Sequence, residues 1–192
     1  MKNIFCVFIL IPFIASSQVV QIHSFMGIKF GATRNEALLT AQQVGAQLHS
    51  IDEQEEVVFL SRLKFAGIES KQAYLKFVDN QFFEGTIEFE VDHSNFIQLF
   101  NNLKLQLIDR YGYGKNYSWV DSPYYWGDGN EFEAILNRKG KLCHAWGNTK
   151  QITSGDFIVM EVCEDSILKI VFQNHNFASM ASRKIRHLSS AN

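Results

Sequence analysis

The sequence is poor in proline and cysteine, and neither sign of charge is in clear excess. Only two prolines and three cysteines occur among 192 residues, and the formal net charge is −2. Without a clustered basic face, the chain has no electrostatic basis for binding nucleic acid. Its composition, 46% hydrophobic and 20% charged, is not that of a disordered protein. We therefore expect a globular domain with a sizeable core.

Motifs for catalysis and for metal or cofactor binding are also missing. The six histidines lack the spacing that a zinc site requires, and there is no glycine-rich phosphate loop or nucleophile elbow. Residues 128–131 have the composition of a calcium loop without its alternating ligands, so helix capping explains them better. We expect no cofactor and no metal, and the sequence leaves open whether the protein is an enzyme.

Long apolar runs are absent except at the amino terminus. Residues 4–14 are almost entirely apolar, and Ala15-Ser16-Ser17 supplies the small residues expected before cleavage at Gln18. The run is shorter than the ~20 residues of a membrane-spanning helix, which argues against the alternative of an uncleaved anchor. We expect residues 1–17 to be a signal peptide, and the mature protein to be periplasmic or secreted without a transmembrane segment.

The two cysteines that remain after cleavage, Cys143 and Cys163, lie in neighbouring predicted strands. A hairpin centred on Thr153 would place them opposite each other, about 4.5 to 5.5 Å apart at their Cα atoms, within the range of a disulfide. An even number of cysteines in an oxidising compartment favours pairing. We predict this disulfide, with two half-buried free thiols as the alternative.

Helix signals and strand signals alternate along the chain. Thr33-x-x-Glu36 is typical of a capping box and predicts a helix from Arg34 to about Leu48. The region 59–65 then favours a strand, with a helix over 55–64 as the alternative, and a hairpin with its turn at residues 79–80 follows. Apolar residues spaced three and four apart predict a second helix, which begins after Asp92 or Ser94 and ends at Gly112.

The remaining elements complete a second, similar series. Asn130-x-x-Glu133 predicts a short third helix, or a strand if residues 137–140 form a hairpin turn. Three strands follow, over 141–147, 157–163 and 168–172. We predict an α+β fold with two helix-plus-three-strand units, residues 27–91 and 92–176, which form antiparallel sheet with the helices packed on one face. Residues 18–176 would be a single domain, and residues 177–192 a flexible tail.

Tyrosine and tryptophan concentrate between the second and third helices. Several glycines and a proline interrupt this stretch, which predicts a long loop. Such rings have a flat apolar face and a polar edge, and they are common where proteins bind sugars, peptides or other proteins. The alternative is that they fold back over the sheet as a small secondary core. The candidate binding residues are Tyr113, Tyr117, Trp119, Tyr124, Tyr125 and Trp126.

Three features together resemble small uncharacterised exported bacterial proteins: the Phe30-Gly-x-Thr-x-x-Glu-Ala motif, the Tyr-Gly pair after the second helix, and the late tryptophan. The order of elements is similar to the helix-then-sheet units of the BamE-like lipoproteins and of the β-lactamase inhibitor proteins, although no lipoprotein signal precedes Cys6. Members of those families bind proteins, so the resemblance implies a binding protein and supplies no catalytic residue.

Three functions are consistent with these patterns. The first is a non-enzymatic exported module that binds a protein of the cell envelope through the aromatic loop, the polar sheet face, or both. The second is a hydrolase or transferase with a dispersed site of aromatic residues and carboxylates, such as Asp121, Asp128 and Glu131. The third is a glycan-binding module.

Overall fold

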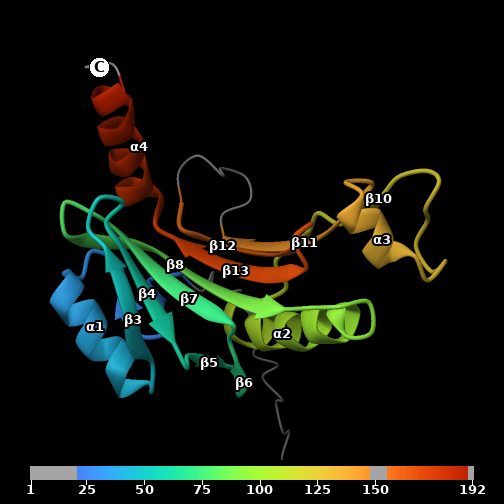
Figure 1. The fold of residues 1–192 in the computed structure, drawn as a ribbon, viewed down its shortest axis with the longest axis horizontal. Coiled ribbons are helices and arrows are strands. Elements are labelled where there is room, and N and C mark those ends of the chain that lie inside the picture. Colours follow the sequence, from blue (N-terminus) through green and yellow to red (C-terminus); the bar gives the residue numbers. More distant parts are fainter. Residues whose placement is uncertain (1–20, 148–154, 190–192) are drawn as a thin grey trace, which may run out of the picture.

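The alternating hydrophobic residues form one large antiparallel sheet in a computed structural model, which describes residues 21–147 and 155–189 (Figure 1). The expected signal peptide lies outside these residues. The strands pair in the order β10-β11-β12-β13-β8-β7-β4-β3, and β9 also pairs with β11. They are β3 (Gln47–Asp52), β4 (Val57–Ser61), β7 (Gln72–Val78), β8 (Gln81–Glu90), β9 (Lys115–Asn116), β10 (Trp119–Val120), β11 (Gly140–Gly147), β12 (Phe157–Val162) and β13 (Ile167–Gln173).

Two short hairpins lie outside the large sheet. The strands β1 (Ser24–Phe25) and β2 (Ile28–Lys29) form the first, and β5 (Lys64–Phe65) and β6 (Ile68–Glu69) form the second. Phe25 and Ile28 are fully buried, so the first hairpin belongs to the core. The predicted strand over 59–65 is therefore two strands, since the chain turns at Arg62, whose φ is +58°.

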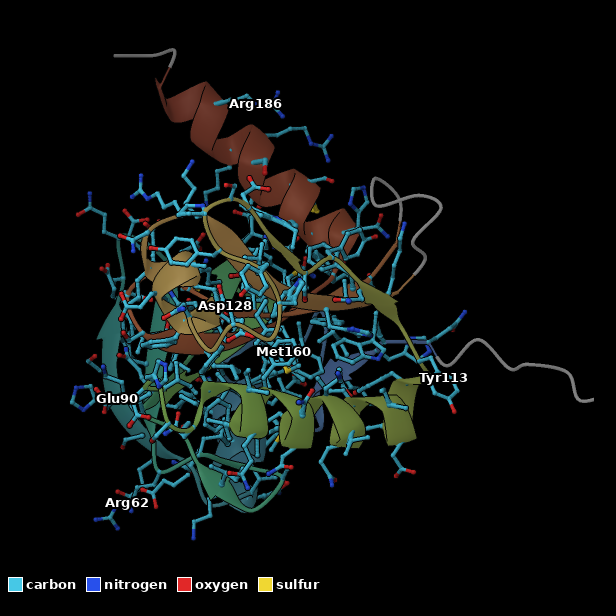
Figure 2. The ribbon with its side chains drawn as sticks, turned by 90° about the vertical axis from the view of Figure 1, so that its right-hand side faces the viewer. Arg62, Glu90, Tyr113, Asp128, Met160 and Arg186 are labelled. Atoms are coloured by element: carbon cyan, nitrogen blue, oxygen red, sulfur yellow. The ribbon has the colours of Figure 1, made fainter. Side chains whose placement is uncertain are left out.

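One face of the sheet carries the core because side chains alternate between the two faces of each strand. Leu142, His144 and Trp146 lie opposite Val162, Met160 and Ile158, as their alternation predicts. The helix α2 (Phe96–Tyr111) covers this face with four buried side chains, and Met160 is buried near it (Figure 2). The buried residues of α2 are Phe96, Phe100, Leu103 and Leu107.

The first helix, α1 (Arg34–Gln43), begins where its capping box predicts. The Thr33 amide donates to Glu36 Oε2 at 2.8 Å, and the Glu36 amide donates to Thr33 Oγ1. The helix is shorter than expected because Gly45, with a φ of +88°, turns the chain into β3. Val44 and Leu48, which the longer predicted helix would include, lie beyond the end of α1 and are exposed.

The mixed α+β class is confirmed, but the two three-strand units are not. The chain before α2 contributes four strands to the large sheet instead of the three that were predicted. The additional strand is β3. The short helix α3 (Glu131–Leu136) lies beside β10 and β11, as Figure 1 shows. Asn130 precedes this helix but makes no side-chain capping bond.

A fourth helix, α4 (His175–Ser189), forms where the sequence suggests a flexible tail. Figure 1 shows α4 rising from one side of the sheet while α1 and α2 lie on the other, so the helices do not share one face. Lys184 anchors α4 to two strand turns, with Nζ 3.0 Å from Glu56 Oε2 and 2.9 Å from Asp79 Oδ1. Within the described residues, no helix is both long and apolar enough to cross a membrane.

Candidate functional site

Most of the rings in the aromatic segment, residues 113–126, reach the surface. The side chains of Tyr113, Tyr125, Trp126 and Trp119 are 84%, 67%, 46% and 41% exposed. Tyr117 and Tyr124 are half-buried. The segment therefore does not fold back as a buried secondary core. Parts of it pair with β11 as β9 and β10, so it is not one continuous loop as predicted.

The six rings do not form one platform. Tyr113 and Asp128, at the two ends of this region, lie well apart in Figure 2. Tyr113 follows α2 directly, where Trp146 Nε1 donates to the Gly112 carbonyl at 2.8 Å and His144 Nε2 donates to the Tyr113 carbonyl at 2.7 Å. The rings must therefore be considered as separate groups.

Tyr125 and Trp126 project from a turn that two carboxylates hold in place. Asp128 accepts from the amides of Tyr125 at 3.0 Å and Asn130 at 2.7 Å, and Glu131 accepts from the Gly127 amide at 2.6 Å. The bond from the Asn130 amide is the main reason that the pKa of Asp128 lies below its usual value. Asp128 and Glu131, two of the three carboxylates considered for catalysis, thus accept hydrogen bonds from backbone amides. The third, Asp121, is exposed.

Trp119 lies apart from these rings and lines a shallow cavity of about 260 Å³, the Trp119 cleft. In the sheet Trp119 pairs with Lys141, whose Nζ lies 3.0 Å from Glu161 Oε2. A second ion pair joins Arg138 to Glu164. The bond with Glu161 raises the pKa of Lys141. The lining is Trp119, Ile135, Arg138, Gly140, Lys141, Glu161, Val162, Cys163 and Glu164.

The cleft lies at one end of the open face, the face of the sheet opposite the core. Strand register places seven residues in one line across this face, and we call this line the central row. Five of the seven are half-buried, Thr86 is fully buried and Ser50 is exposed. The central row is Ala145, Val159, Val171, Thr86, Tyr74, Phe59 and Ser50.

Rows of opposite charges flank the central row. Lys76 Nζ lies 2.7 Å from Glu84 Oε1 on one side, and Lys169 Nζ lies 3.4 Å from Glu88 Oε1 on the other. The pair of Lys141 and Glu161 extends this second side toward the Trp119 cleft. The open face therefore has a mostly apolar centre, interrupted by the hydroxyl groups of Thr86, Tyr74 and Ser50. Its border carries compensated charge, because each of these cations has a carboxylate partner.

The predicted disulfide is wrong. Cys143 lies opposite Glu161 rather than Cys163, so the true register differs from the predicted one by two residues, and both cysteines are free. Their side chains do lie on the face opposite the core, as alternation predicts. Burial raises the pKa of each thiol to about 11.

We expect both thiols to react with iodoacetamide slowly in the folded protein at pH 8 and rapidly in urea. The thiolate is the reactive form, and with a pKa of about 11 it is about a thousandth of each thiol at this pH. Mass spectrometry without reductant should count two modified cysteines in the unfolded protein that lacks residues 1–17 and with them Cys6. A chain that gains no label in urea until a reductant is added would contradict the free thiols.

The described part of the chain contains no group of three or more His, Cys, Asp or Glu side chains placed to hold a metal ion. Comparisons of the whole chain with protein-family models, with curated proteins and with solved structures gave no match.

Proposed function

We propose that this chain is a non-enzymatic exported binding module that holds a protein partner against the open face of its sheet. The observation that carries the proposal is the central row, which crosses seven strands and includes the side chains of Tyr74, Val171 and Val159. An apolar centre within a polar border is the usual anatomy of a protein interface. The helices α1 and α2 pack on the other face, while α4 stands on this side of the sheet, where it borders Lys76 and Glu84 and leaves the strands beyond them uncovered by any of these three helices.

Tyr74 and Phe59 are the strongest candidates for binding hot spots on this surface. Their ring centroids lie 6.0 Å apart, and Lys76 Nζ lies 5.6 Å from the Tyr74 centroid. Aromatic side chains near the centre of an interface usually contribute most of its affinity. Because the bordering charges are already paired, we expect a partner with an apolar contact surface and little net charge there.

The exposed rings of Tyr125 and Trp126 give the module a second contact. Their turn is held by Asp128 and Glu131, so binding would require little ordering of the loop.

We also propose that residues 27–91 and 92–176 are two related units. Their last strands, β8 and β13, pair antiparallel at the middle of the sheet, which supports this relation.

Site-specific photo-cross-linking in the cells that make the protein tests the proposed surface. A benzophenone side chain at Val171 should cross-link one defined protein, whereas the same group at Leu105 should not. Leu105 is the matched control because it is 59% exposed on α2, away from the open face. Equal cross-linking from both positions, or none from Val171, would contradict the proposal.

Affinity measurements with the identified partner complete the test. In calorimetry we expect Tyr74→Ala to weaken binding at least about tenfold, the size of a moderate hot spot. Leu105→Ala and Asp121→Asn should leave the affinity unchanged. If the protein instead converts a substrate, and replacing Asp121, Asp128 or Glu131 abolishes that conversion, the enzyme interpretation would be favoured.

A further inference from the structure

The Trp119 cleft, at the end of the open face and outside the central row, has the features of a site for a small ligand. An exposed indole, two ion pairs and two aliphatic side chains line one cavity of about 260 Å³. We infer that the Trp119 cleft binds one uncharged sugar ring of a glycan. The inference does not rest on the proposed protein partner, because the cleft is formed by this chain alone.

The indole provides the surface on which a sugar ring can stack. A pyranose ring presents C–H groups on its faces, and these pack against the flat, electron-rich face of tryptophan. Trp119 is 41% exposed although its backbone is fixed by pairing with β11. The ring is therefore accessible on a backbone that is already ordered, which lowers the ordering cost of binding. Ile135 and Val162 add apolar wall to the same cavity.

The charges of the cleft indicate a neutral ligand. Arg138 and Lys141 supply two cations, and Glu161 and Glu164 supply two carboxylates, each paired with one of the cations. An anionic ligand, such as a phosphate or a uronic acid, would have to compete with carboxylates that are already bound. Sugar hydroxyls can donate to the carboxylate oxygens and accept from the cationic nitrogens without breaking either pair.

The size of the cleft limits the ligand to about one ring. Pockets for drug-sized molecules usually measure about 300 to 1,000 Å³, and this cavity lies just below that range. Because the cavity is shallow, the rest of an oligosaccharide can continue outside it. We therefore expect one sugar unit to be recognised and its neighbours to contribute little affinity.

Fluorescence titration of the Trp126→Phe protein, in which Trp119 is the exposed tryptophan, tests the inference. Maltohexaose, cellohexaose and chitohexaose serve as uncharged probes, and an oligogalacturonate of similar length serves as the charged one. We expect at least one uncharged probe to shift the emission saturably below about 10 mM. We expect a further Trp119→Ala change to weaken binding at least tenfold, measured by calorimetry, and Glu164→Gln to weaken it less.

Cys163 provides a second readout because its side chain lines the same cavity. In the Cys143→Ala protein, the bound sugar should slow modification of Cys163 by N-ethylmaleimide, and an unbound sugar should not. No response to any uncharged probe, tighter binding of the oligogalacturonate, or unchanged binding after Trp119→Ala would overturn the inference. Each of these results would leave the Val171 cross-link intact, so failure here differs from failure of the proposed function.

Discussion

Replacing Gly85 with alanine is expected to lower the free energy of unfolding by about 3 kcal/mol, near the upper end for overpacking. A Cβ atom at this position of β8 would lie 2.4 Å from Cγ of the Phe25 ring and 2.5 and 2.7 Å from its two Cδ atoms. Phe25 cannot simply move away, because it is fully buried and meets the Phe172 ring edge-on at 5.4 Å. Urea unfolding followed by circular dichroism measures the loss.

A double-mutant cycle tests whether the contact with Phe25, rather than any other effect of a side chain at this position of β8, causes the loss of stability. Phe25→Ala alone should cost about 3 to 5 kcal/mol because it leaves a cavity. In that background, Gly85→Ala should be neutral or stabilising by up to about 1 kcal/mol, since glycine inside a strand is itself unfavourable. Equal costs of Gly85→Ala in the two backgrounds would show that the Phe25 ring is not the obstacle.

The elements that the sequence predicts well are those whose signals are local. Alternation predicts the paired faces of β11 and β12, because the side-chain period of a strand is two. The start of α1 at Thr33 and the end of α2 at Gly112 follow from caps that neighbouring residues build themselves. The turn at Asp79 and Asn80, both with positive φ, also needs only its own two residues.

The features that were missed depend on contacts between distant residues. Strand β3 has no buried side chain and contains an irregularity at His49, so its sequence shows no alternation. The register of β11 on β12 is set by the whole sheet, and a two-residue difference is enough to separate Cys143 from Cys163. The anchoring of α4 by Lys184 depends on turns more than 100 residues earlier in the chain.

The sequence predicts which aromatic residues are candidates for the site, but it does not predict which of them lie together on the surface. The aromatic residues could be named from the sequence, and Trp119 and Trp126 are exposed. Their separation could not be predicted, because it depends on how β9 and β10 pair with β11. The central row was missed for a related reason. Residues from seven strands form one line only after the strand order is known.

The other large effect is expected at Trp146, where replacement by alanine should cost about 3 to 5 kcal/mol. The indole is 1% exposed, and its ring centroid lies 4.6 Å from that of His144. Its Nε1 group also donates to the Gly112 carbonyl, so the variant loses a buried hydrogen bond as well as apolar contact. Urea unfolding again measures the change.

The same indole supports the turn that carries Tyr113. A Cβ atom at Gly114 would lie 2.9 Å from two atoms of the Trp146 ring, so the turn packs directly on it. Trp146→Phe keeps most of the apolar contact but removes the donor, and should cost about 1 to 3 kcal/mol. Trp126→Ala, at a 46% exposed ring, should change stability by less than about 0.5 kcal/mol. If Trp146→Ala proved as mild as Trp126→Ala, the indole would not hold this turn, and the exposure of Tyr113 would need another cause.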